Sequence, residues 1–171
     1  MDFADVVRAR YSCRAYEDRP VEDDKLQRIL EAARLAPSAS NRQEWRFVVV
    51  RDAAKRQALV KVARDQAFVG QAPIVIAACA KTNGHVMSCG HRCDIIDVAI
   101  ALEHIALAAA NEGLGTCWIG AFFQDKAKEL LGIPDDVPVI ELMTLGYPAD
   151  SPKPKSRLAL DEIVMYDAWR S

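Results

Sequence analysis

Two arginines four residues apart, Arg10 and Arg14, flank Ser12 near the start of this chain. Guanidinium groups donate paired, charged hydrogen bonds, which makes them preferred partners for a phosphate group. A solvated helix end explains the same residues, because arginine also suits the negative end of a helix dipole. Taken by itself, this local pattern favours the solvated helix end.

A second candidate for chemistry is the loop of residues 36–43, Ala-Pro-Ser-Ala-Ser-Asn-Arg-Gln. Its small residues let the backbone approach a ligand closely, and the amides of Asn41 and Gln43 both donate and accept hydrogen bonds, as the edge of a heterocycle requires. Pro37 must end the preceding helix, since proline disfavours helical backbone in the residue before it. A plain connection between helix and strand explains this loop as well as a ligand site does.

Cysteine and histidine gather between residues 79 and 93, at Cys79, His85, Cys89, His91 and Cys93. These side chains are ligands for zinc or an iron–sulfur cluster. Structural zinc sites favour two short cysteine pairs, however, and this loop has one. A thiol pair in a mobile loop, or coincidence, explains the spacing better, and no metal is predicted.

The element that must position these residues is a long apolar helix over residues 95–110, interrupted only by Asp97, Glu103 and His104. A helix that is apolar nearly all round must be buried on most sides, and a second subunit is one way to cover it. The three polar residues keep the apolar run below the ~20 residues of a bilayer crossing. We expect them to make cap and interface hydrogen bonds, because buried polar groups need partners.

Four strands are predicted from apolar runs, at residues 45–50, 73–79, 116–120 and 139–145. Helices of unequal length separate them, and glycines at 113 and 132 are placed to end helices in the left-handed conformation. This order predicts an α+β sandwich. The Gly113-Leu114-Gly115 element follows a helix and precedes a strand, the reverse of a dinucleotide fingerprint, so a Rossmann fold is rejected.

The composition is that of one globular domain, residues 1–171, with 51% hydrophobic and 27% charged residues. A net charge of −2 gives no electrostatic reason to expect nucleic acid or an anionic membrane as a partner. Five cysteines are an odd and sparse set, and the N-terminus lacks the features of a signal peptide, so we expect a reducing cytoplasm. Beyond Gly146, three prolines predict an extended arm over about residues 147–171, which is too apolar to remain undocked.

Together these segments resemble the flavin-dependent nitroreductase family over nearly the whole chain. The matching pieces are Arg10-Tyr11-Ser12-Cys13-Arg14, residues 36–45, Asp97 with the long helix, residues 113–120, and Leu145-Gly146-Tyr147-Pro148 with Lys155-Ser156-Arg157. Each piece is weak alone, but their order and spacing are specific. The resemblance implies a central mixed β-sheet flanked by helices, in an interlocked homodimer that exchanges its C-terminal arms.

The resemblance also implies that FMN binds non-covalently at the dimer interface. The residues it assigns to the phosphate and ribityl chain are Arg10, Ser12 and Arg14, with Tyr11 beside them and Lys155 or Arg157 completing the phosphate site. Those it assigns to the flavin from the other subunit are Pro37, Ser38, Ala39, Asn41 and Gln43. Those it brings to the isoalloxazine ring are Trp118, Ile119 and Gly120, where backbone amides would polarise N5.

The implied activity is hydride transfer from NAD(P)H to FMN and of two electrons onward to a small, flat acceptor such as a nitroaromatic or a quinone, by a ping-pong mechanism. The cofactor supplies this chemistry, so no catalytic side chain is predicted. The weaker candidates for substrate contacts are Phe68, Phe122 and Phe123.

Two features depart from the family pattern. Tyr11 stands where many relatives have a second arginine, and the chain lacks the long insertion that forms a substrate lid in larger members. The alternatives that stay open are an FMN enzyme for dehalogenation or flavin fragmentation, a flavin-binding dimer without catalysis, and a metal module at the cysteine loop.

Overall fold

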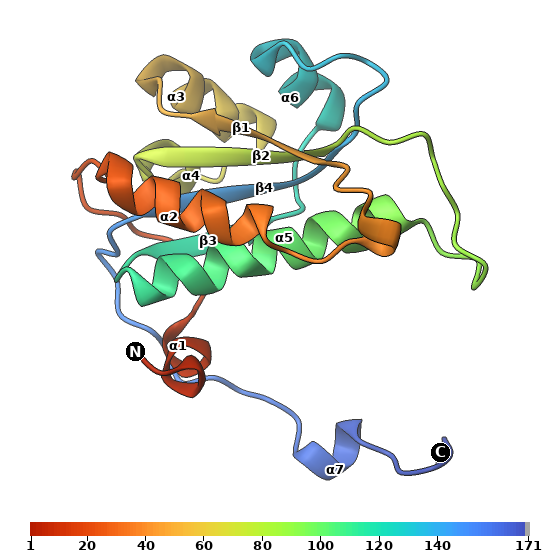
Figure 1. Cartoon of the computed structure of the whole chain (residues 1–171). Coiled ribbons are helices and arrows are strands. Elements are labelled where there is room, and N and C mark those ends of the chain that lie inside the picture. Colours follow the sequence, from red (N-terminus) through yellow and green to blue (C-terminus); the bar gives the residue numbers. More distant parts are fainter. Residues whose placement is uncertain (170–171) are drawn as a thin grey trace.

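A four-stranded β-sheet forms the centre of the computed structural model, which describes residues 1–169 (Figure 1). Its strands are β1 (Trp45–Val50), β2 (Ile74–Ala80), β3 (Gly115–Ile119) and β4 (Val139–Gly146), in the spatial order β1-β2-β4-β3. All three neighbouring pairs run antiparallel. An isolated bridge between Ser12 and Thr116 is parallel.

The expected mixed sheet is therefore wrong, and the strand order gives the reason. β2 and β3 point the same way and are joined across the sheet by a long helix, the connection that usually makes parallel neighbours. β4 enters between them and pairs with each in the antiparallel sense. The α+β sandwich itself, a β-sheet with helices packed on its faces, is as predicted.

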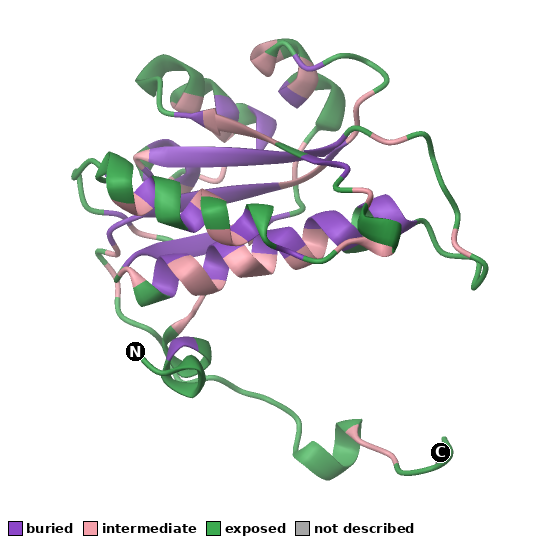
Figure 2. Ribbon diagram, in the orientation of Figure 1, coloured by how far each residue is buried: buried purple, intermediate pink, exposed green. Residues whose placement is uncertain are grey.

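Helices cover both faces of this sheet (Figures 1 and 2). On one face lie α2 (Asp23–Arg34) and α5 (Cys93–Asn111), and on the other lie α3 (Ala53–Val62), α4 (Phe68–Gln71) and α6 (Gln124–Leu131). Side chains alternate along a strand, so Ile76 of β2 packs into the α5-side cluster while Val75 packs into the α3-side cluster. Every residue of β2 is buried, which confirms it as a central strand.

The helix ends have clear local causes, and those predicted at Pro37, Gly113 and Gly132 are confirmed. The Asp52 carboxylate accepts the N–H of Lys55 at 2.8 Å and caps the start of α3. Gly113 after α5 and Gly132 after α6 have φ values of 76° and 66°, the left-handed conformation that glycine adopts without steric cost. α2 ends three residues before Pro37.

One side of α5 is left uncovered within this chain. Val98, Leu102 and Ile105 are fully buried against α2 and the sheet. Facing away are Ile95 and Ile96, which are 48% and 42% exposed. We call the apolar residues of α5 that are exposed or half-buried and lie outside the core cluster the open face of α5, and they are Ile95, Ile96, Ala99 and Leu107.

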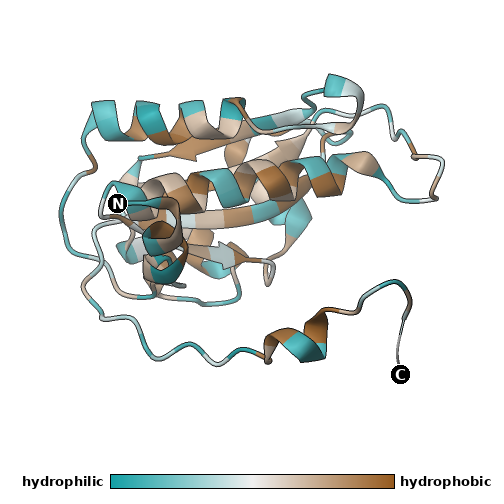
Figure 3. Ribbon diagram, turned by 60° about the horizontal axis from the view of Figure 1, so that its bottom comes forward, coloured by the Kyte–Doolittle hydropathy of each residue, from teal (hydrophilic) through white to brown (hydrophobic). Residues whose placement is uncertain are grey.

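After β4 the chain leaves the sheet as an arm, residues 148–169, that extends away from the body (Figures 1 and 3). It is irregular except for α7 (Leu160–Ile163), a single helical turn that the expectation of a fully extended arm omitted. The large apolar side chains it exposes are Leu158, Leu160, Ile163, Tyr166 and Trp169. Within residues 1–169, no helix has the length and apolar character to cross a membrane.

Candidate functional site

The segment of residues 10–14, which follows α1 (Phe3–Ala9), lies beside the edge strand β3. The N–H of Cys13 donates to the carbonyl of Thr116 at 2.9 Å. Gly115 permits this approach, because a Cβ atom there would lie 2.7 Å from the Cβ of Cys13. The backbone that carries Arg10, Ser12 and Arg14 is thus fixed against the sheet, and we call residues 10–14 the basic loop.

A cavity of about 510 Å³ lies between the basic loop and the start of the arm. Its lining brings together predicted residues that are far apart in the sequence, namely Arg10, Tyr11, Ser12, Arg14, Lys155 and Arg157. Four of these are cationic. The local spacing of Arg10 and Arg14 favoured a solvated helix end, but their position in this cavity favours an anion site.

The cationic side chains that line this cavity outnumber its one acidic lining residue, Asp150. Desolvation, followed by the charges of Arg10 and Arg157, lowers the pKa of Lys155. The Nε of Arg10 is buried without a hydrogen-bond partner, and its closest carboxylate oxygen, on Glu103, is 3.7 Å away. A phosphate in the cavity would relieve the repulsion between the cations, so the donor set fits a phosphate such as that of FMN.

Lys155 and Arg157 differ in how many of their hydrogen-bond donors are already used within the protein. The Nζ of Lys155 donates to the carbonyls of Val7 and Arg8 at 3.0 and 2.6 Å, at the end of α1, where a cation suits the helix dipole. Arg157 donates to the carbonyl of its neighbour Ser156 at 2.6 Å. Arg157 therefore has more of its donors available for an anion.

The predicted flavin loop is held at the N-terminal end of α5. The buried carboxylate of Asp97 accepts the N–H of Ala39 at 3.1 and 3.3 Å, which is a contact with a distant loop and not a cap of α5. The hydroxyl of Ser38 accepts the N–H of Gln43 at 3.0 Å. Three residues of the loop have left-handed backbone, with φ values from 50° to 54°, and they are Ser40, Asn41 and Gln43.

The basic loop and the predicted flavin loop both contact side chains of α5. Arg10 faces Glu103, and Ala39 is tied to Asp97, six residues earlier on the helix and about 9 Å along its axis. His104, the third polar residue of this helix, shares a hydrogen bond with the carbonyl of Ala32 at 3.0 Å. Residues 37–43 do not line the cavity of the basic loop, so a single chain does not bring the two predicted groups together.

The third predicted group ends β3. Trp118 is half-buried against the α5-side cluster, and Ile119 is buried in the α3-side cluster. A Cβ atom on Gly120 would lie 3.3 Å from a carboxylate oxygen of Glu141, whose pKa is raised by burial. Sequence reasoning missed Glu141, a half-buried carboxylate within β4.

The three phenylalanines predicted to contact substrate lie apart from this cavity. Phe68 begins α4, and both Phe68 and Phe122 pack against the α3-side cluster. Phe123 lies between the cationic groups of Arg64 and Lys126, at 4.9 and 4.8 Å from its ring centre.

The cysteine loop does not assemble the ligands of a metal. Cys93 is buried, with Sγ 3.7 Å from a carboxylate oxygen of Glu44, whereas Cys89 is exposed. Within residues 1–169, no three side chains of His, Cys, Asp or Glu have the arrangement of a metal site.

The difference in burial predicts how the thiols react. Burial raises the pKa of both Cys13 and Cys79 to about 11, and Cys93 and Cys117 are buried as well. Thiolates are the reactive form, so we expect one fast-reacting thiol per chain, Cys89, when native protein is treated with Ellman's reagent at pH 8. Unfolded protein should give five. More than one fast thiol in the native protein would contradict this packing.

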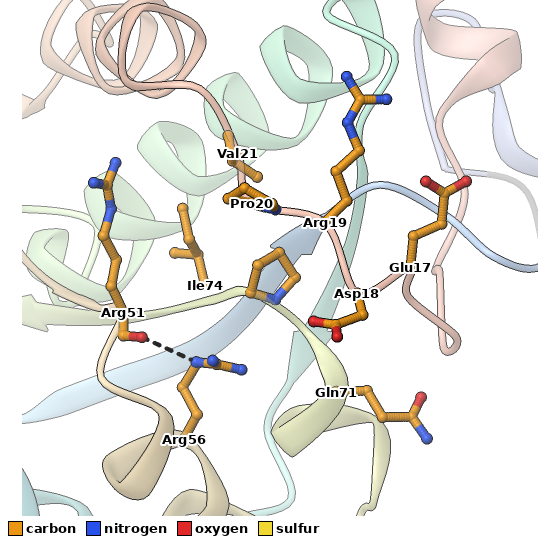
Figure 4. A pocket seen from close by; sticks show the side chains of 10 residues that line it. Glu17, Asp18, Arg19, Pro20, Val21, Arg51, Arg56, Gln71 and Ile74 are labelled. Atoms are coloured by element: carbon orange, nitrogen blue, oxygen red, sulfur yellow. Dashed lines mark hydrogen bonds between the residues drawn. The ribbon is translucent and has the colours of Figure 1, made fainter.

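A second pocket, of about 260 Å³, lies between residues 17–21 and the ends of α3 and α4 (Figure 4). Arg51 and Arg56, which line this pocket, already have partners within the protein. Arg56 donates to the carbonyls of Arg51, Gly70 and Ala72, and Arg51 pairs with Asp23. We therefore place the candidate site at the cavity of the basic loop.

The fold is an α+β sandwich, and the cationic cavity at the edge of its sheet is suited to a phosphorylated ligand. Comparison with known proteins identifies the family. A sequence model described as the nitroreductase family matches residues 7–85 and 60–147. The chain therefore belongs to the nitroreductase family.

Individual relatives agree with this assignment. A protein of Archaeoglobus fulgidus, provisionally named NADH dehydrogenase/NAD(P)H nitroreductase, is 36% identical over 85% of this chain and 84% of its own. An NADPH-flavin oxidoreductase of Vibrio harveyi is 30% identical over 94% of this chain and 71% of its own. The crystal structure of a nitroreductase family protein from Clostridium novyi has a TM-score of 0.82 at 37% identity, and covers 91% of this chain and 89% of its own.

Proposed function

We propose that this protein is an FMN-dependent oxidoreductase that takes hydride from NAD(P)H and passes two electrons to a flat, electron-poor acceptor, such as a nitroaromatic or a quinone. The observation that carries the proposal is the cationic cavity, where Arg10 has a buried Nε without an acceptor. The names of the relatives, NAD(P)H nitroreductase and NADPH-flavin oxidoreductase, support the same activity.

Each group of residues has a distinct part in this proposal. Arg10, Arg14 and Arg157 hold the phosphate, with the Ser12 hydroxyl as a further donor. Bound FMN supplies the ring that accepts hydride and delivers electron pairs. The backbone N–H groups near Ile119 and Gly120 donate hydrogen bonds to the ring, and the loop of residues 37–43 lines it.

The second subunit completes the site in this proposal. The loop of residues 37–43 and the basic loop belong to different sites within one chain, and a symmetric dimer brings one of each together. The open face of α5 and the apolar residues of the arm are the surfaces that the partner covers. Burying them in a dimer would remove from water the exposed apolar side chains of Ile95 and Ile96 and those of the arm.

A ping-pong mechanism follows from one shared binding face. Bound FMN would offer the same ring face to the nicotinamide and to the acceptor in turn, and this chain lacks the long insertion that forms a lid in larger members of the family. The protein's contribution is to hold and orient the two reactants in turn.

The absorption spectrum tests the proposal. Protein purified without added cofactor, or loaded with FMN, is expected to show the flavin bands near 375 and 450 nm, and anaerobic NADH or NADPH should bleach the 450 nm band. Addition of a quinone or a nitroaromatic should restore it. A colourless protein that takes up no FMN would refute the proposal, and a flavoprotein that neither nucleotide reduces would refute the enzymatic part.

A further inference from the structure

One acidic residue lies within the cationic cavity, at the point where the arm begins. The Asp150 carboxylate accepts hydrogen bonds from the Tyr11 hydroxyl at 2.9 Å, the Cys13 thiol at 3.3 Å and the Arg14 backbone N–H at 3.1 Å. The Tyr11 hydroxyl also lies 3.0 Å from the backbone carbonyl of Asp150. One side chain of the arm thus contacts three of the five residues in the basic loop.

The carboxylate contacts neutral donors in the loop and not the guanidinium groups beside it. The side chain of Arg14 instead donates to the carbonyl of Ser12 at 3.3 Å. Burial disfavours the charge on Asp150, but the hydrogen bonds from Arg14, Tyr11 and Cys13 outweigh burial and lower its pKa. Asp150 is therefore ionised at neutral pH and leaves the cations available to a ligand.

The geometry of an extended segment explains what these contacts achieve. Side chains alternate along such a segment, so fixing residues 11 and 13 also sets the direction of residues 10, 12 and 14. Cys13 is fully buried, whereas Ser12 and Arg14 are exposed to the cavity. Anchoring Tyr11 at the wall of the cavity and Cys13 in the interior thereby fixes the backbone that carries the phosphate donors.

We propose that Asp150 is a positioning residue that holds the basic loop in the conformation that binds the FMN phosphate, and so couples this binding to the placement of the arm. The inference rests on the proposed function, because the phosphate is that of FMN. Asp150 itself needs no contact with the cofactor.

The sign of the effect separates positioning from simple electrostatics. Asp150→Ala removes a negative charge from the edge of an anion site, and Coulomb's law alone predicts tighter FMN binding. Loss of the hydrogen bonds that order the loop predicts weaker binding. We expect the second effect to dominate, with FMN binding about tenfold weaker, because several charge-assisted hydrogen bonds are lost and the ligand must then order the loop.

The experiment compares FMN with riboflavin, which has the same ring but no phosphate. Dissociation constants of both flavins are measured by fluorescence quenching on the full-length apoprotein. Asp150→Ala should weaken FMN binding and leave riboflavin binding unchanged, which a general loss of structure would not do. Asp161→Ala is the matched control, since it removes the same charge from an exposed position of the arm and should change neither constant.

Two further variants keep the test decisive if Asp150→Ala does not fold. Asp150→Asn preserves the shape and should weaken FMN binding in the same sense. Tyr11→Phe removes one donor and should weaken FMN binding by a smaller factor, with no added effect when combined with Asp150→Asn.

The outcomes distinguish this inference from the proposed function. Wild-type protein that prefers FMN to riboflavin, with variants that keep or increase this preference, would overturn the role of Asp150 alone. Equal losses for both flavins would overturn it as well. Wild-type protein that binds no FMN would overturn the proposed function and, with it, this inference.

Discussion

Replacing Arg157 by alanine is expected to weaken FMN binding by roughly 30- to 150-fold. A guanidinium group that makes charge-assisted hydrogen bonds to a phosphate contributes about 2–3 kcal/mol, and each 1.4 kcal/mol changes the dissociation constant tenfold. Arg157 lines the cationic cavity and is little occupied by the protein, since it donates to the carbonyl beside it in the sequence. Fluorescence titration of the apoprotein with FMN measures the change.

Lys155→Ala is the matched comparison, and it should cost less FMN affinity. The ammonium group of Lys155 already donates to two carbonyls at the end of α1, so part of its loss should appear as lower thermal stability. Riboflavin binding should change little in either variant. A larger loss of FMN affinity from Lys155→Ala than from Arg157→Ala would contradict the assignment of the phosphate to Arg157.

Replacing Ile96 by aspartate is expected to convert the proposed homodimer into single chains of 18.9 kDa and to release FMN. Ile96 is 42% exposed on the open face of α5. The substitution should not harm the isolated chain, because an acidic residue near a helix N-terminus is favourable. In a symmetric dimer the unpaired carboxylate is buried twice, at a cost of several kcal/mol each time.

Light scattering coupled to size-exclusion chromatography measures the mass, and the flavin absorbance of the same peak measures the cofactor. Ala58→Asp is the control, since it adds the same charge to an exposed position of α3, on the other side of the sheet. It should leave both mass and cofactor unchanged. An Ile96→Asp protein that remains a flavin-loaded dimer would exclude the open face of α5 as the interface.

Local features of this fold could be predicted from the sequence because their causes are local. Residues 45–50 are rich in aromatic and β-branched residues and form β1 with the predicted bounds. Asp52 and Gly132 mark helix ends through the geometry of a single turn. The insertion of β4 between β2 and β3 depends on contacts between strands that are far apart in the sequence. No periodicity within a segment carries that information.

The candidate site likewise contains residues that the sequence could predict and residues that only the fold brings together. The phosphate residues were predicted from the resemblance, and their own spacing favoured a different explanation. Asp150 was missed because its partner Tyr11 is 139 residues away in the sequence, and an aspartate after a proline turn has no local pattern that marks it. Phe68 was chosen for its aromatic type, and the structure packs it against the core.

The left-handed backbone at Ser40, Asn41 and Gln43 has a consequence for the energetics of ligand binding. Non-glycine residues in this region each cost of the order of 1 kcal/mol, and here the carboxylate of Asp97 and the hydroxyl of Ser38 hold the loop that contains them. The cost of the left-handed backbone in this loop is thus met by the stability of the folded chain, before any ligand binds. If this loop lines the flavin as proposed, a ligand meets a surface already formed, and binding loses little conformational entropy in the loop.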